Sequence, residues 1–265
     1  MRATRNPIRR NRNIGTKKSG YGCNNKLVIP QKSDDTRMFW ELLPDYKVIT
    51  CKLNGKDIKF IVEPTKPNYR YCCTIEDIMY LLKYVPEKDI STLDLFVFRQ
   101  PKRKEEILKP VWGRVDFSFD NGKYSGPAII FEAIECNKTL YWNRKLDIAS
   151  IDEIERLRSD GHKIINDKRS FIIHTDFDST RSTQLYRTLL HEIGHWVHWQ
   201  KVMLSVNDSH KYYSIPINER EAFAHRYAHE LKEKLTNEKV LPFDMRPCEG
   251  EGIKQYFDIL RIINF

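Results

Sequence analysis

The segment His191-Glu192-Ile193-Gly194-His195 places two histidines four residues apart, with a glutamate directly after the first of them. Residues four apart on a helix face the same way, with Cβ atoms about 5–6 Å apart, so two imidazoles at this spacing can converge on one metal ion. Glu192 lies one position further round the helix, where it can reach a metal-bound water without binding the ion. The segment therefore indicates a helix that carries Zn²⁺ and a general base.

An apolar periodicity extends this predicted helix on both sides, from about Ser182 to Met203. His198 returns to nearly the same helix face as His191. However, seven residues place it about 10.5 Å further along the axis. We therefore do not expect His198 to bind the same ion. The residues that form the apolar side of the helix are Leu185, Leu189, Leu190, Ile193, Trp196 and Val197.

Two histidines leave the site one ligand short, because zinc sites that also hold a water use three protein ligands. A second helix is predicted from about Asn218 to Leu235, where Glu221 shares a face with two alanines, at 224 and 228. Small residues on that face allow the two helices to approach closely, so Glu221 is the preferred third ligand. Two alternatives remain open. Asn218 can cap this helix with Glu221 as its N3 partner, and Glu219 is a competing carboxylate.

A second motif begins at the preferred third ligand and reads Glu221-x-x-Ala224-x-Arg226-Tyr227-Ala228-x-Glu230-Leu231. Together with residues 191–195 it resembles the ImmA/IrrE-type zinc metallopeptidases. The run Asn218-Glu-Arg-Glu-Ala-Phe-Ala224 is also similar to the catalytic domain of anthrax lethal factor. Both resemblances select Glu221 over Glu219 and cover roughly residues 170–231. His225 departs from the pattern, because the family usually has Asn, Asp or Glu at that position.

The resemblance implies an α+β fold with a zincin-like metallopeptidase domain, and a zinc-dependent endopeptidase that hydrolyses peptide bonds of a protein substrate. His191, His195 and Glu221 would hold the zinc ion, and Glu192 would take a proton from the metal-activated water. The lethal-factor-like group also places a tyrosine shortly before the third ligand to support the oxyanion. Tyr212 and Tyr213 are the candidates for that catalytic role.

In the same families, a strand just before the metal helix forms the rim of the cleft, and the substrate peptide adds to it as a further strand. The segment Ser170–Thr175 fits this description, so we expect it to bind the substrate through its main chain. His174 and His210 are further histidines that could assist at the site, although each can equally be an ordinary surface or core residue.

The sequence divides into residues 1–33, a strand-rich region or module at 34–135, and the metallopeptidase domain at 136–265. Asn54-Gly55 predicts a hairpin turn within residues 45–63. Thr74 and Asp77 predict a capped helix start, and Ser150 is expected to begin another helix that ends at Gly161. A turn-rich segment is expected at 176–180 and a polar loop at about 205–216. Further strands are expected at 93–98, 111–119 and 128–134, with a turn at Asn121-Gly122.

Residues 1–33 hold all of the excess positive charge. They contain nine basic residues and no acidic one, while the remaining 36 basic residues balance 36 acidic residues. This tail is poor in apolar residues, so we expect it to be disordered when free and able to touch nucleic acid nonspecifically. The alternative to an enzyme is therefore a non-catalytic zincin-fold protein that contains zinc and binds nucleic acid or a protein partner through this tail.

Composition excludes several other classes of protein. The longest apolar runs fall well short of the roughly 18 residues of a membrane span, and the N-terminus lacks the apolar core of a signal peptide. The six cysteines contain no Cys-x-x-Cys pair and indicate no disulfide framework. We therefore expect a cytoplasmic protein without membrane contact.

Overall fold

The computed structural model describes residues 37–257, apart from residues 39, 103–104, 107–110, 136–137 and 207. The elements described below all belong to the compact unit Phe39–Phe265. The predicted basic tail, residues 1–33, lies outside the described residues. The described part has the mixed α+β composition that the sequence predicts.

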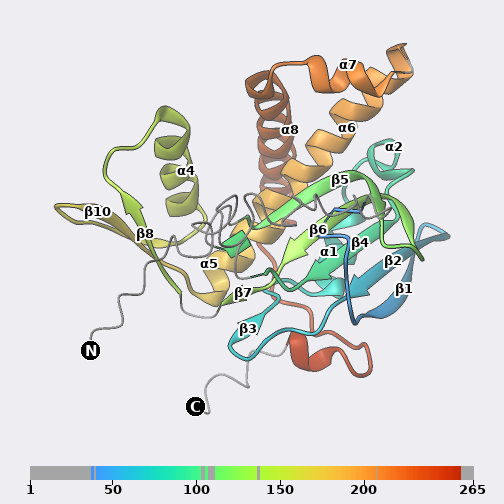
Figure 1. Cartoon of the computed structure of the whole chain (residues 1–265), viewed down its shortest axis with the longest axis horizontal. Helices are drawn as coiled ribbons and strands as arrows, with labels where there is room; N and C mark the ends of the chain where they lie inside the picture. The colour runs from blue at the N-terminus through green and yellow to red at the C-terminus, as the bar shows by residue number, and fades with distance from the viewer. Residues whose placement is uncertain are drawn as a thin grey trace, which may run out of the picture. The chain divides into compact units, whose positions relative to one another are not determined.

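A five-stranded mixed sheet forms the centre of this unit, in the order β1-β2-β4-β6-β5 (Figure 1). Its inner pairs, β2 with β4 and β4 with β6, are parallel, whereas both outer pairs are antiparallel. The predicted hairpin is confirmed: Asn54 and Gly55 have φ values of 51° and 81°, as a type I′ turn requires. The strands are β1 (Lys47–Leu53), β2 (Lys56–Val62), β4 (Leu95–Arg99), β5 (Gly113–Asp120) and β6 (Ser125–Glu132).

Both faces of the sheet are buried, because successive side chains of a strand point to opposite faces. Phe96 and Phe98 of β4 face a large apolar cluster that includes residues of the helices, from Ile75 to Leu235. Leu95 and Val97 face a smaller cluster on the other side, which Trp40, Leu43 and Tyr46 cover. This two-sided burial accounts for the nearly continuous apolar sequences of the inner strands.

The helix α1 (Ile75–Leu82) begins as predicted, with Thr74 and Asp77 in a reciprocal capping box. Asp77 has a second partner, because both of its carboxylate oxygens accept hydrogen bonds from Arg181, at 2.9 and 3.2 Å. It also accepts one from the backbone N–H of Arg246. A single buried carboxylate therefore joins the start of α1 to two distant segments. The short helix α2 (Glu87–Ile90) follows.

A second, three-stranded sheet has the order β8-β10-β9, and α4 (Ile148–Ser159) lies beside it (Figure 1). The outer strands β8 (Thr139–Asn143) and β9 (Lys163–Asn166) are absent from the sequence predictions; β10 (Ser170–His174) matches its predicted position. The predicted start of α4 at Ser150 is wrong: Asp147 caps the helix by accepting from the Ser150 N–H. A two-stranded ladder pairs β3 (Tyr69–Arg70) with β7 (Ile134–Glu135).

The C-terminal half is mostly helical and differs from the predictions at two places. The turn expected at 176–180 is the short helix α5 (Phe177–Arg181), capped by Asp176. The loop expected at 205–216 contains α7 (Ser209–Ser214), capped by Asp208. In both cases an aspartate forms an N-cap instead of a turn. The remaining elements are the π-helix η1 (Ser182–Thr188), α6 (Leu189–Val206), α8 (Ile217–Asn237) and the 3₁₀ helix η2 (Lys254–Tyr256).

Among the residues that the structure describes, no helix combines the length and the hydropathy needed to cross a lipid bilayer.

The larger apolar cluster contains strand residues before position 135 and helix residues after it, such as Phe131 and Leu189. The sheet and the helices that follow it therefore share one apolar core.

We predict that Asp77→Ala lowers the free energy of unfolding by about 3–5 kcal/mol, because it leaves the largely buried Arg181 without its counter-charge. Urea denaturation followed by circular dichroism measures the effect. Asp57→Ala is the matched control, because Asp57 pairs with Lys52 at 2.7 Å on the exposed surface, and its loss should change the midpoint little. Equal effects of the two substitutions would contradict the prediction.

Candidate metal centre

Three side chains that the sequence predicts as metal ligands meet where α6 crosses α8. The Nε2 atom of His191 lies 3.3 Å from one carboxylate oxygen of Glu221, and the Nε2 atom of His195 lies 3.4 Å from the other. The ligand atoms all lie within 4.8 Å of one another, so the three residues could hold a metal ion. Both imidazoles thus present the same nitrogen toward a shared point.

The close approach of the two helices depends on small residues at their crossing. A Cβ atom added to Gly194 would lie 2.9 Å from the Cα atom of Ala224 and 3.0 Å from its carbonyl oxygen. Ala224 is completely buried, and Ala228 is buried one turn later, as their predicted role at the helix interface requires. Gly194 stands between the two histidines, so the contact that brings the helices together also brings the ligands together.

The first residues of α8 decide between the alternatives for Glu221. The helix begins at Ile217, with Pro216 at the N-cap position and no side-chain cap. Asn218 therefore does not cap the helix, and Glu221 is not the N3 partner of a capping box. Glu219 lies in the first turn and is not a member of the three-residue group.

Hydrogen bonding and burial perturb the pKa of the Glu221 carboxylate. Contacts with His191 and His195 hold the pKa of Glu221 well below its usual range, so the carboxylate is ionised at neutral pH. Its side chain is 44% exposed, whereas those of the two histidines are 13% and 12% exposed. The group is therefore accessible to solvent from the Glu221 side.

Glu192 lies beside the three ligands and is fixed by the sheet. Its Oε2 atom accepts a hydrogen bond of 2.8 Å from the backbone N–H of Val115, on the edge strand β5. The side chain is buried, and this burial raises the pKa of its carboxyl group. The sequence pattern predicts the position of Glu192, but nothing in it identifies the backbone donor, which lies 77 residues away.

The structure places the two candidate tyrosines differently. Tyr212 is buried, and its hydroxyl lies 3.3 Å from the Nδ1 atom of His195. A partner on the second nitrogen of a metal-ligating histidine fixes the orientation of its ring. Burial raises the pKa of Tyr212 to about 12, so its hydroxyl remains protonated. Tyr213 is 57% exposed and contacts the rings of Tyr212 and Phe117.

His225 is the residue at which the sequence departs from the pattern of the metallopeptidases that it resembles. Its ring centroid lies 4.4 Å from that of His191, whose Nδ1 atom is buried without a hydrogen-bond partner in the part of the chain that the structure describes. Burial, followed by the neighbouring His191, lowers the pKa of His225 to about 4, so the ring is neutral at neutral pH. A neutral imidazole can pack against a metal ligand without electrostatic repulsion.

The other histidines considered from the sequence lie outside the group. His198 stacks on Phe223 with ring centroids 4.3 Å apart, as its distance from His191 along the helix leads one to expect. His174 has its Nδ1 atom 3.3 Å from the Thr139 hydroxyl in the three-stranded sheet. His210 is exposed in the first turn of α7.

The prediction that a peptide adds to the strand Ser170–Thr175 is wrong for a physical reason. The corresponding strand β10 pairs with β8 on one side and with β9 on the other, so both of its edges are already occupied. The strand next to the metal helix is β5, which lies at the edge of the five-stranded sheet. The sequence analysis did not identify β8 and β9 as strands, so it could not show that both edges of β10 are paired.

We predict that Gly194→Ala lowers the free energy of unfolding by about 1–3 kcal/mol, although alanine favours helices, because the new methyl group meets the backbone of α8. Thermal or urea denaturation measures the change. Glu230→Ala, at an exposed position of α8, is the control and should leave stability nearly unchanged. A Gly194→Ala protein as stable as the wild type would show that the helices do not pack this closely.

The chain was also compared with known proteins. No family model matches it, and neither a curated protein nor a solved structure shows significant similarity to it. The function is therefore inferred from the residues of this site and from their geometry.

Proposed function

We propose that the protein is a zinc-dependent endopeptidase that hydrolyses peptide bonds of a protein substrate, within a zincin-like α+β fold. The observation that carries the proposal is the convergence of two Nε2 atoms and one carboxylate, at 3.3 and 3.4 Å, with Glu192 beside them. Residues 170–231 resemble the ImmA/IrrE-type metallopeptidases and the lethal factor catalytic domain, whose activity is of this kind.

The donor set fits zinc. Two imidazole nitrogens and one carboxylate are the ligands of the glutamate-type catalytic zinc sites, which keep a fourth position open. His191, His195 and Glu221 would hold the ion, and the exposed side of Glu221 leaves room for substrate. When bound, the zinc ion supplies Lewis acidity, because it polarises the substrate carbonyl and lowers the pKa of a water.

The residues of the chain supply the proton transfers and the alignment. The Val115 N–H holds Oε2 of Glu192, so Oε1 is left to take a proton from the attacking water and deliver it to the leaving amine. The Tyr212 hydroxyl, next to the Nδ1 atom of His195, holds the orientation of that ring. In this proposal Glu192 acts as the base, supported by its contact with Val115, and is not a metal ligand.

A purely structural zinc site explains these observations less well than a catalytic one. Such sites are closed by four protein ligands, whereas the group among the described residues has three. A structural site also has no need for a buried carboxylate held next to its ligands. The alternative, a non-catalytic protein that binds nucleic acid or a partner through residues 1–33, makes no use of Glu192.

We predict about one zinc ion per chain, measured by elemental analysis after expression without chelators. The double substitution His191→Ala with His195→Ala should abolish zinc binding. Glu221→Ala should weaken it by at least tenfold, whereas Glu219→Ala is the matched control and should not. If Glu219→Ala loses zinc and Glu221→Ala keeps it, the third ligand is Glu219 and the choice of Glu221 is wrong.

We predict that Glu192→Gln retains zinc but loses peptidase activity by several orders of magnitude, because the amide cannot accept the proton. The experiment compares newly formed protein termini in cells that express the wild type or Glu192→Gln, by mass spectrometry. Termini that appear with both proteins to the same extent would exclude proteolysis by this site.

A further inference from the structure

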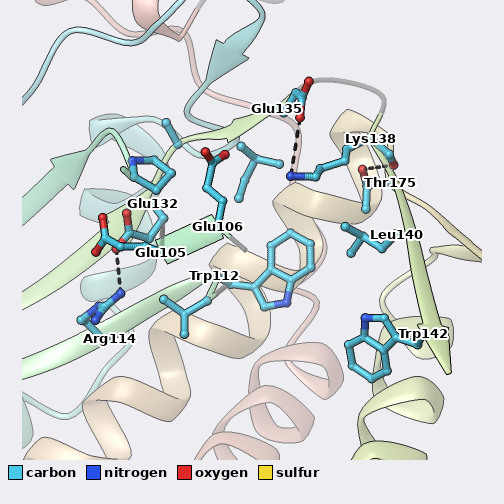
Figure 2. Close-up of a pocket in the computed structure, with 14 residues that line it drawn as sticks. Glu105, Glu106, Trp112, Arg114, Glu132, Glu135, Lys138, Leu140, Trp142 and Thr175 are labelled. Atoms are coloured by element: carbon cyan, nitrogen blue, oxygen red, sulfur yellow. Dashed lines mark hydrogen bonds and ion pairs between the residues drawn. The ribbon is translucent and has the colours of Figure 1, made fainter. Parts of the chain in front are cut away.

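A cavity lies between the start of β5, the end of β6 and the strand β8 (Figure 2). It offers about 130 Å³, where about 10–15 Å³ suffices for one water, so a side chain can enter. Trp112 and Arg114 line it, and the next residue, Val115, holds Glu192. At about 3.3 Å per residue of strand, Trp112 is roughly 10 Å from Val115. The cavity is thus about three peptide residues from the proposed base.

The walls of the cavity are mostly apolar. Trp112 comes from the residue before β5, while Leu140 and Trp142 are alternate residues of β8 and so share one face of that strand. Figure 2 shows the two tryptophans and Leu140 around the same space. Such walls suit the methylene groups of a long side chain, which can bury its stem while its head remains polar.

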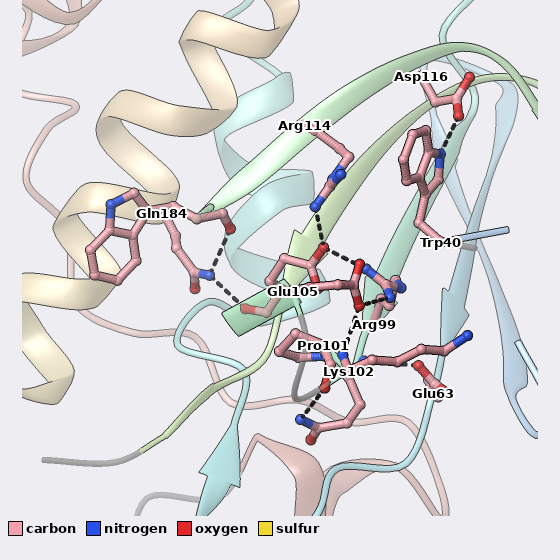
Figure 3. A network of polar contacts seen from close by, with 12 residues as sticks. Trp40, Glu63, Arg99, Pro101, Lys102, Glu105, Arg114, Asp116 and Gln184 are labelled. Atoms are coloured by element: carbon pink, nitrogen blue, oxygen red, sulfur yellow. Dashed lines mark hydrogen bonds and ion pairs between the residues drawn. The ribbon is translucent and has the colours of Figure 1, made fainter. Parts of the chain in front are cut away.

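One end of the cavity carries a buried ion network (Figure 3). Arg99 donates to Oε1 of Glu132 at 2.8 Å and to Oε2 of Glu105 at 2.5 Å. Arg114 donates to the same Oε1 atom of Glu132 at 3.0 Å. Each glutamate therefore uses one oxygen. The other oxygens, Oε2 of Glu132 and Oε1 of Glu105, are buried and have no hydrogen-bond partner among the described residues.

The charges of the described residues around the cavity leave a negative excess. Among those that line it, four are glutamates, at positions 105, 106, 132 and 135, against the cations Arg114 and Lys138. The buried Arg99 behind them reduces the excess to one negative charge. Glu132 has a side chain only 3% exposed, and burial raises the pKa of its carboxyl group, which is the direction expected when a carboxylate lacks enough compensation.

These features select among ligand chemistries. An anionic side chain would be repelled by the glutamates, and an apolar one would leave their negative excess without compensation. A long side chain with a cationic head meets both requirements, because its stem packs on the tryptophans and its positive head lies near the carboxylates of Glu132 and Glu105. The five donors of a guanidinium serve two carboxylates better than an ammonium does.

We propose that this cavity is the specificity pocket of the peptidase and takes an arginine side chain of the substrate, about three residues from the cleaved bond. The assignment rests on the proposed function of the metal site. Lysine fits the same pocket with fewer hydrogen bonds.

Binding is tested with the zinc-loaded full chain carrying Glu192→Gln, so that peptides are not consumed. The probes are three fluorescently labelled alanine nonapeptides with arginine, citrulline or norleucine at the central position, and affinity is measured by fluorescence anisotropy. Citrulline keeps the shape of arginine but removes its charge. The arginine peptide should bind at least about tenfold more tightly than either of the others. Equal affinities, or no binding of the arginine peptide at millimolar concentration, would overturn the proposal.

Two substitutions in the same background test the location. Glu105→Gln removes the charge of one carboxylate of the ion network, and Trp142→Ala removes a wall without touching that network. Glu105→Gln should abolish most of the preference for arginine over citrulline. Trp142→Ala should instead weaken the binding of both peptides, because they share the stem that packs on this wall. Glu155→Gln, an exposed glutamate of α4 paired with Arg158, is the matched control and should change neither. A preference for arginine that survives Glu105→Gln, or full affinity for both peptides in Trp142→Ala, places the arginine elsewhere and overturns the proposal.

Cleavage by the wild type separates this proposal from the proposed function. A peptide mixture should be cut with arginine or lysine enriched at one fixed position, two to four residues from the bond, and Trp142→Ala should lose that enrichment. Cleavage without a fixed basic position would overturn the pocket and leave the peptidase standing. Arginine binding that depends on Glu105, without any cleavage, would support the cation site and overturn the peptidase.

Discussion

The contact between Gly194 and Ala224 is the constraint on which the candidate site depends. A metal ligand set drawn from two helices requires the helix axes to be close, and only a residue without Cβ allows that distance at position 194. Because His191 and His195 lie on either side of this glycine, the packing contact and the ligand geometry are set together. The carboxylate of Glu221 then reaches both imidazoles from the facing helix.

The sequence predicted those turns and helix starts that are determined by a few neighbouring residues. Asn54-Gly55 specifies its hairpin because both residues accept positive φ, and Thr74 with Asp77 specifies a helix start by reciprocal hydrogen bonds. The strands β8 and β9 were not predicted, although residues such as Tyr141 and Trp142 favour strands. Their pairing with β10 is a contact between separate segments, which the sequence of one segment does not reveal. The same pairing occupies both edges of β10, so the expected peptide-binding role could not be judged from that strand alone.

The candidate site also contains features that neighbouring residues determine and features that depend on distant segments. The spacing of His191 and His195 on one helix is a local property, and the sequence predicts it fully. Choosing Glu221 required a face argument about a second helix, and Pro216 rather than Asn218 as the N-cap is what leaves its carboxylate free. The donor to Glu192 is the backbone N–H of Val115. A pattern of side chains in the sequence cannot identify a backbone donor. The neighbour of His195, Tyr212, comes from a helix that the sequence did not reveal.

The strand β5 connects the proposed chemistry with the proposed selectivity. A Cβ atom at Gly113 would lie 2.8 Å from the carbonyl oxygen of Ile130 and 3.0 Å from a methyl carbon of Thr188, so this strand is held tightly between β6 and the helix that continues into α6. Val115, two residues later, fixes the carboxylate of Glu192, while Arg114 between them contacts Glu132 in the cavity. A peptide that filled the cavity as proposed would therefore lie against the same strand that holds Glu192. Because a strand cannot shift one residue without shifting its neighbours, the backbone of β5 would then fix the distance between the selected side chain and the cleaved bond.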